Sequence, residues 1–162
     1  MKRLWAPWRT EYIHGPKSRE CIFCREYGKG DKKDLILHRG NFASVMMNKF
    51  PYNNGHLLVY PWKHTGLMEE MGADETLEVF RFIKESVSIL KKEMNPGGFN
   101  IGMNLGKAAG AGIDEHIHFH VVPRWNGDTN FMPVIGEVRV MPEHLQATYE
   151  KLYPHFQKLN TA

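Results

Sequence analysis

Three histidines alternate with apolar residues in the segment His116-Ile117-His118-Phe119-His120-Val121-Val122. Alternate side chains of a β-strand lie on one face, so this spacing predicts that the three imidazoles point the same way. The intervening apolar side chains then face the core. Two kinds of chemistry fit the pattern. Histidines two apart on a strand can bind zinc. Alternatively, a neutral imidazole can attack phosphorus while its neighbours hold or donate protons near neutral pH.

A glycine-rich loop precedes the histidine strand, with glycines at positions 102, 106, 110 and 112. Glycine lets the backbone approach a ligand closely and turn N–H groups inward. Concavities lined by such amides bind phosphate. The spacing is not that of a P-loop. Placed directly before the histidines, however, the loop favours a phosphate site beside a histidine nucleophile.

The only two cysteines, Cys21 and Cys24, form one C-x-x-C pair. In a cytosolic protein this spacing suggests metal or redox chemistry rather than a structural disulfide. No βαβ pattern follows the pair, which argues against a thioredoxin-like motif. The spacing alone leaves a metal site, a redox pair and two free thiols as alternatives.

The elements that must position these residues read as an α+β fold with a mainly antiparallel sheet, one long helix and a C-terminal helix. Apolar residues at steps of three and four predict a helix over 74–94 that ends at 95–98. Its expected core stripe is Leu77, Phe80, Ile83, Val87, Leu90 and Met94. A second helix is expected over 142–158, with Pro142 in its first turn, and a short one around 67–71. The predicted strands span 35–39, 42–48, 56–61, 99–105 and 116–122, with a tight turn at 40–41.

Length and composition set the outer limits. The 162 residues predict one domain, with an irregular arm over 1–34, a core over 35–124 and a C-terminal extension over 125–162. Hydrophobic residues make up 42% and charged residues 24%, which excludes intrinsic disorder. No apolar run approaches about 18 residues, and the N-terminus has no secretory signal, so we expect a cytoplasmic protein that does not enter the membrane. The net charge of +3 is scattered, which predicts no nucleic-acid partner but suits a small anionic ligand.

These motifs together resemble the histidine triad family of nucleotide hydrolases and transferases, over roughly residues 21–124. The most specific likeness is His116-x-His118-x-His120-Val121-Val122-Pro123-Arg124. A second block consists of Asn48, Gly55-His56-Leu57-Leu58-Val59 and Pro61-Trp62-Lys63-His64. Segments 3–9, 109–113 and 124–133 look most like the branch that contains diadenosine tetraphosphate phosphorylases and related bacterial proteins.

The resemblance implies a double displacement. His118 would attack the α-phosphorus of an adenine nucleotide and form a nucleotidyl-histidine, with its other ring nitrogen held by a backbone carbonyl. His120 would hydrogen-bond the phosphate and stabilise the leaving group. The remaining substrate positions that the resemblance implies are Asn48 at the ribose, His56 lining the site, Asn104 at a phosphate, and Gly110 and Gly112 in the loop.

One departure bears on the second step. Many family members carry Gly-Gln just before the triad, where this chain has Ala111-Gly112. The missing side chain leaves room for a second phosphate as acceptor, which favours phosphorolysis. Some transferases of the wider superfamily end the triad in glutamine, whereas this chain ends it in His120. That feature favours hydrolysis.

The resemblance also implies a zinc site made by Cys21, Cys24, His64 and His116. Two cysteines and two histidines make a closed tetrahedral set, so the zinc would be structural rather than catalytic. It would attach the N-terminal arm to the start of the triad strand.

We therefore predict nucleotidyl transfer on dinucleoside polyphosphates, with diadenosine tetraphosphate and orthophosphate giving ADP and ATP. The resemblance implies a homodimer, and no redox cofactor is expected. Three alternatives stay open: a hydrolase of dinucleoside polyphosphates or nucleoside phosphoramidates, a zinc hydrolase with all three triad histidines on the metal, and a slow nucleotide-binding sensor.

Overall fold

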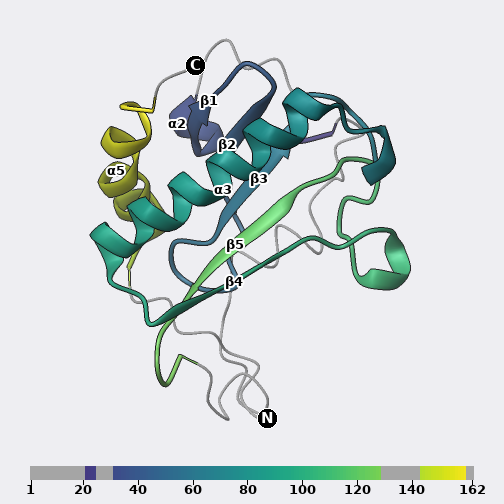
Figure 1. Cartoon of the computed structure of the whole chain (residues 1–162). Coiled ribbons are helices and arrows are strands. Elements are labelled where there is room, and N and C mark those ends of the chain that lie inside the picture. Colours follow the sequence, from purple (N-terminus) through teal and green to yellow (C-terminus); the bar gives the residue numbers. More distant parts are fainter. Residues whose placement is uncertain (1–20, 25–30, 129–142, 160–162) are drawn as a thin grey trace.

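Five antiparallel strands form a sheet in the order β1-β2-β3-β5-β4 in the computed structural model, which describes residues 21–24, 31–128 and 143–159 (Figure 1). The strands are β1 (Ile36–Arg39), β2 (Ala43–Met47), β3 (Leu57–Pro61), β4 (Gly98–Gly102) and β5 (Phe119–Arg124). The helical elements are α2 (Asp31–Asp34), η1 (Met68–Glu70), α3 (Ala73–Met94), η2 (Lys107–Ala109) and α5 (Leu145–Phe156). The predicted α+β class and the antiparallel sheet are confirmed.

The two faces of the sheet are covered differently. Helix α3 packs against β2, β3 and β5, and α5 packs against β1 and α3. The large core lies on this side and contains Val45, Val59 and Val121. A smaller apolar cluster lies on the opposite face, made by Phe23, Ile36, Met46, Leu58 and Tyr60. Because β2 and β3 are covered on both faces, all of their residues are buried, and they read as continuous apolar runs.

The histidine strand begins later than its period-two pattern predicts. β5 starts at Phe119, so His116 and His118 lie before the ladder. The partner strand explains the difference: β3 ends at Pro61, which has no N–H to donate. The segment before β5 bonds to a loop instead, since the N–H of Ile117 donates to the Thr65 carbonyl at 2.8 Å. The predicted strand over 99–105 also ends early, at Gly102.

Helix α3 has its expected length, but the predicted core stripe is wrong at two positions. Leu77 is 71% exposed and Phe80 is 53% exposed. The buried face is rotated and consists of Glu78, Val79, Phe82, Ile83, Ser86, Ile89 and Leu90. A polar residue lies on this face because the Glu78 carboxylate accepts N–H groups from Phe42 and Ala43 in the turn between β1 and β2.

Helix α5 starts at Leu145, so the predicted start at Pro142 is wrong. His144 caps the helix, because its Nδ1 accepts a hydrogen bond from the N–H of Gln146 at 3.3 Å. Pro142 lies outside the described residues, as does most of the predicted arm over 1–34. The short helix expected near 67–71 is the 3-10 turn η1. In the part of the chain that the structure describes, no helix is both long and apolar enough to span a membrane.

Candidate functional site

The three triad imidazoles lie on one face of the segment, away from the large core. The side chains between them, Ile117 and Phe119, belong to that core together with Val121. His118 and His120 lie next to each other, with ring centroids 5.0 Å apart. The alternation therefore places the histidines as the sequence predicts, although only His120 is within the ladder.

His118 is held in one tautomer by the backbone. Its Nδ1 lies 2.9 Å from the carbonyl oxygen of His116. A carbonyl only accepts hydrogen bonds, so Nδ1 carries the proton and Nε2 keeps a lone pair. Burial lowers the pKa of His118 below its ordinary value of 6.5. The ring is therefore neutral at pH 7, which is the form that a nucleophile requires.

His120 is linked to a fourth histidine. The Tyr52 N–H donates to His56 Nδ1 at 3.0 Å, so His56 carries its proton on Nε2. That Nε2–H donates to His120 Nδ1 at 2.9 Å. A neutral His120 therefore keeps its own proton on Nε2. Burial, with nearby His118, lowers the pKa of His120 to about 4. At pH 7 His120 thus offers one N–H donor without a positive charge.

Two aromatic rings that sequence reasoning missed lie against these histidines. Phe23 packs on His118, with ring centroids 4.9 Å apart, and Tyr52 stacks on His120 at 5.5 Å and an angle of 20°. Tyr52 is 50% exposed, so its ring forms an open side of the site. Phe23 stands between the two cysteines and Tyr52 four residues before His56. The position of each beside a predicted ligand or site residue was a signal that could have identified it.

The other predicted substrate positions lie at different distances from the triad. Asn48 is adjacent, with its Nδ2 3.3 Å from His56 Nδ1. Asn104 follows the end of β4, where Gly102 lies opposite His120 in the ladder. Within the described residues, the structure gives no contact that joins Asn104, Gly110 or Gly112 to a triad histidine.

The glycine loop differs from the expected amide concavity. The N–H of Gly110 donates to the carbonyl of Lys107, and the N–H groups of Ala109 and Ala111 donate to that of Gly106. Three of its amides are therefore used inside the turn. Gly106 and Gly110 have φ of 76° and 85°, and a Cβ at either would meet nothing within 4 Å. The loop contributes open space beside the site more clearly than it contributes donors.

The four predicted metal residues come together. The ligand atoms of Cys21, Cys24, His64 and His116 all lie within 4.8 Å of one another. His116 Nδ1 is 3.4 Å and 3.3 Å from the two Sγ atoms and 3.2 Å from His64 Nδ1, and Cys24 Sγ is 3.1 Å from His64 Nδ1. Tetrahedral zinc with ordinary bond lengths sets ligand atoms roughly 3.3–3.7 Å apart. The cluster thus has about the size that such an ion needs.

The surroundings of the cluster also suit a metal. His116 Nε2 lies 2.9 Å from the Pro61 carbonyl, so the proton is on Nε2 and the Nδ1 lone pair faces the thiols. Partial burial and the neighbouring Cys21 thiol raise the pKa of Cys24 to about 11. A bound cation reverses this preference and releases the thiol proton. These four residues form a candidate metal site separate from Nε2 of His118.

Comparison with known proteins agrees with this site. The HIT domain matches residues 29–127. An AP-4-A phosphorylase of Mycobacterium tuberculosis is 36% identical over 157 residues, covering 91% of this chain and 80% of that protein. An adenosine 5'-monophosphoramidase of Schizosaccharomyces pombe is 26% identical, covering 82% of this chain and 95% of that one. The crystal structure of a zinc-bound histidine triad family protein from Mycobacterium smegmatis matches with a TM-score of 0.61 at 24% identity, covering 76% and 84% of the two chains. The chain therefore belongs to the histidine triad (HIT) family and is an enzyme of that family.

Proposed function

We propose that this enzyme is a diadenosine tetraphosphate phosphorylase that works through a nucleotidyl-histidine. The observation that carries the proposal is the hydrogen bond from His118 Nδ1 to the His116 carbonyl, which leaves a neutral Nε2 with a free lone pair. The 36% identity to the mycobacterial AP-4-A phosphorylase supports the choice of substrate.

In the first step, His118 Nε2 attacks the α-phosphorus of diadenosine tetraphosphate. A phosphorus–nitrogen bond forms, the bond from the α-phosphorus to the bridging oxygen breaks, and ATP leaves. His120 Nε2–H donates a hydrogen bond to the phosphate oxygens on which charge builds up. In the second step, an oxygen of orthophosphate attacks the same phosphorus, the bond to nitrogen breaks, and ADP is released.

The choice of orthophosphate over water rests on the space at the loop. Gly110 and Gly112 are exposed and have no side chain, so a second phosphate can enter beside the α-phosphate. Water as the acceptor gives AMP in place of ADP. The products therefore distinguish phosphorolysis from hydrolysis.

The test is to incubate the protein with diadenosine tetraphosphate, with and without orthophosphate, and to separate the nucleotides. We expect ADP and ATP only when orthophosphate is present. His118→Ala should abolish turnover and the acid-quenched mass increase of one adenylyl group, whereas His144→Ala, an exposed histidine at the start of α5, should change neither.

Other outcomes overturn the proposal in favour of a named alternative. AMP and ATP without orthophosphate identify a hydrolase. Turnover of a nucleoside phosphoramidate alone identifies an activity like that named for the fission yeast relative. Nucleotide binding without an adduct identifies a sensor.

We also propose that the Cys21, Cys24, His64 and His116 cluster holds structural zinc. The donor set of two thiolates and two imidazoles matches the preference of zinc, and the name of the mycobacterial structure records bound zinc. Four protein ligands leave no open position, so the metal would supply stability rather than activate water. Two unpaired thiols suit the reducing cytoplasm, the compartment that we propose.

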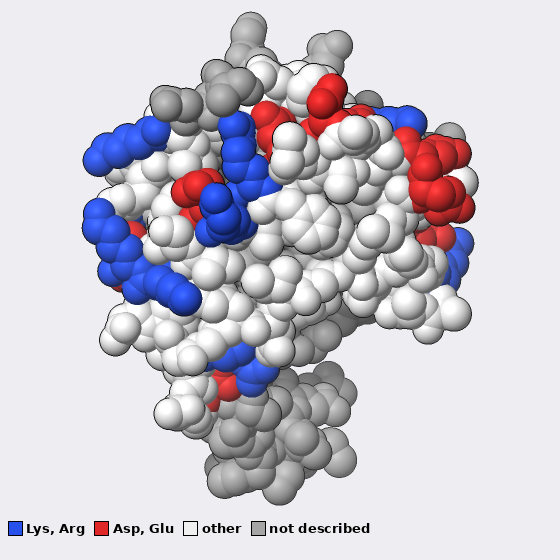
Figure 2. All heavy atoms as spheres, viewed as in Figure 1, with Lys and Arg blue, Asp and Glu red and all other residues white. Residues whose placement is uncertain are grey.

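Finally, we propose a homodimer built on the β4 edge. β4 is the outer strand of the sheet, and its sequence carries no lysine or proline that would block pairing. Ile101 is 48% exposed on this strand. Leu77 and Phe80 are exposed on α3, and the Phe80 ring lies 5.7 Å from that of Phe119 in β5. Figure 2 shows that the surface over α3 and β4 is largely uncharged across its middle. A second copy could extend the sheet across a two-fold axis and cover these side chains.

A further inference from the structure

We propose that Asn53 and Asp128 are positioning residues for the triad. They hold the loop that carries Tyr52 and His56 in the place where it sets the proton on His120. The inference deepens the proposed function of the same site and rests on it.

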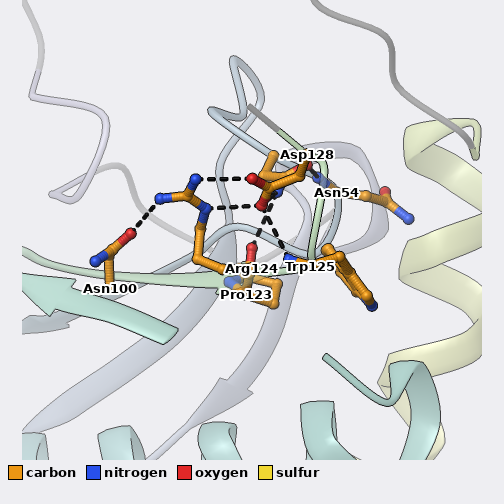
Figure 3. A network of polar contacts seen from close by, with 7 residues as sticks. Asn54, Asn100, Pro123, Arg124, Trp125 and Asp128 are labelled. Carbon is orange, nitrogen blue, oxygen red and sulfur yellow. Dashed lines mark hydrogen bonds and ion pairs between the residues drawn. The ribbon is translucent and has the colours of Figure 1, made fainter. Parts of the chain in front are cut away.

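The first observation is the set of donors around Asp128. The Arg124 guanidinium donates to both carboxylate oxygens, through Nε at 2.7 Å and Nη2 at 2.7 Å. The Trp125 N–H adds a bond at 3.0 Å, and Figure 3 shows these donors converging on the carboxylate. The Asp128 side chain is 11% exposed. Two-pronged ion pairs of this kind are among the most geometrically fixed contacts in proteins.

The second observation is that this carboxylate also binds the loop between β2 and β3. Asn53 Nδ2 donates to Asp128 Oδ2 at 2.8 Å and to the Pro123 carbonyl at 3.1 Å. The same residue organises its own loop. Its Oδ1 accepts the N–H of Asn54 at 3.1 Å, and its carbonyl accepts the N–H of His56 at 3.2 Å. One side chain therefore joins the loop to the end of β5.

The third observation connects this link to the chemistry. Tyr52 immediately precedes Asn53, and its N–H is the donor that fixes His56 as the Nε2–H tautomer. His56 in turn donates to His120, which is on β5, the strand that Arg124 ends and Asp128 follows. The Asn53–Asp128 bond thus connects the two segments whose relative position determines the hydrogen bond from His56 to His120. If it is lost, the loop can move and His56 is free to exchange tautomers.

The network itself provides a matched control. Arg124 also donates from Nη1 to Oδ1 of Asn100 on β4, on the side away from the loop. Asn53→Ala removes the arm that reaches the loop, and Asn100→Ala removes the arm that reaches β4. Both variants delete one asparagine side chain from the same ion pair.

The test compares these variants with the wild type by NMR of the imidazole nitrogens and by single-turnover kinetics with diadenosine tetraphosphate. We expect Asn53→Ala to average the nitrogen shifts of His56 and His120 toward mixed tautomers and to slow adduct formation about 10- to 100-fold. AMP affinity should change less than about threefold, since the phosphate and ribose contacts remain. Asp128→Asn should act in the same direction, because its amide faces donors, and Asn100→Ala should leave both readouts at wild-type values.

The proposal is overturned if Asn53→Ala keeps the wild-type nitrogen shifts. It is also overturned if Asn53→Ala and Asn100→Ala slow adduct formation equally, in proportion to their losses in melting temperature. The NMR pattern needs no turnover, so it separates this inference from the proposed function. A wild-type protein that forms no adduct but whose tautomers respond to Asn53→Ala would contradict the proposed reaction and retain the positioning role.

Discussion

His118 is poised for attack by a proton that lies on the far side of its own ring. The His116 carbonyl fixes that proton on Nδ1, and burial keeps the ring from taking up a second one. His120 reaches its state by a different route, through His56 and the backbone of Tyr52. Two neighbouring imidazoles thereby differ in role: one presents a lone pair and the other presents an N–H.

The pH dependence of kcat/KM follows from these states. The pKa of His118 is lowered, so its neutral form persists below pH 6.5 and is lost only as the pH falls further. We expect kcat/KM for diadenosine tetraphosphate to stay level from pH 8 to 6.5 and then to fall, with a midpoint below 6.5. Protonation of His120 near pH 4 adds to the loss. The measurement is initial rates from pH 4 to 8, each with a return to pH 7.5 to check reversibility, and a midpoint above 6.5 would contradict the assignment.

At the scale of elements, α3 does more than cover the sheet. The Glu78 carboxylate accepts the N–H groups of Asn41, Phe42 and Ala43 at 3.2, 2.6 and 2.7 Å, and so fixes the β1–β2 turn to the helix. The turn must approach closely, because a Cβ on Gly40 would come within 2.5 Å of Glu78 Oε2. This contact explains why a charged residue occupies the buried face of the helix.

Glu78→Gln should therefore lower the free energy of unfolding by about 1–3 kcal/mol. The amide retains one acceptor oxygen, but its NH2 group replaces the other and faces a backbone donor. Denaturant unfolding of the variant measures the loss. Glu85→Gln, a half-buried carboxylate on the same helix, serves as the control, and an equal effect of the two substitutions would disprove the role of Glu78.

At the scale of the whole molecule, the metal cluster joins distant parts of the chain. Cys21 and Cys24 come from the N-terminal segment, and the two histidines come from the loop after β3 and the segment before β5. A metal present at about 1,000 times its dissociation constant contributes about 4 kcal/mol to folding. This corresponds to a rise in melting temperature of about 8–16 °C for a chain of this size.

We therefore expect chelation to lower the melting temperature by about that amount and added zinc to restore it. Cys24→Ser should melt near the chelated value and respond little to the chelator. Calorimetry together with elemental analysis of the purified protein measures both effects. Protein that carries no zinc, or whose melting temperature ignores the chelator, would refute the structural role. Zinc that survives Cys21→Ala, with activity lost at once on chelation, would instead point to a zinc hydrolase.

The proposed dimer is the second prediction at this scale. Ile101→Asp places a charge on the β4 edge and should raise the dissociation constant of the dimer about 100-fold, giving an 18.8 kDa monomer at low concentration. Leu67→Asp is the control, since Leu67 is 51% exposed but lies before η1. Light scattering coupled to gel filtration measures the mass. A wild-type monomer, or a dimer unaffected by Ile101→Asp, would exclude this interface.

The sequence by itself determined the family, the α+β class and the residues of the candidate metal site. These features were readable because they depend on local spacing: period two places His116, His118 and His120 on one face, and C-x-x-C sets two thiols close together. The long helix was readable for the same reason. Its length depends on the recurrence of apolar residues and on the Asn95-Pro96 stop.

The tertiary structure decided what depends on partners far away in the chain. Leu77 and Glu78 are neighbours in sequence, and only the β1–β2 turn determines that the carboxylate is buried and the leucine exposed. Likewise, β5 starts at Phe119 because Pro61 ends its neighbour, and no local pattern carries that information. Tyr52, Asn53 and Asp128 remained unassigned as site residues, since their roles arise from contacts across more than 60 residues of chain. Periodicity reports which side chains share a face, whereas the tautomer of a histidine is set by whichever donor the fold places against it.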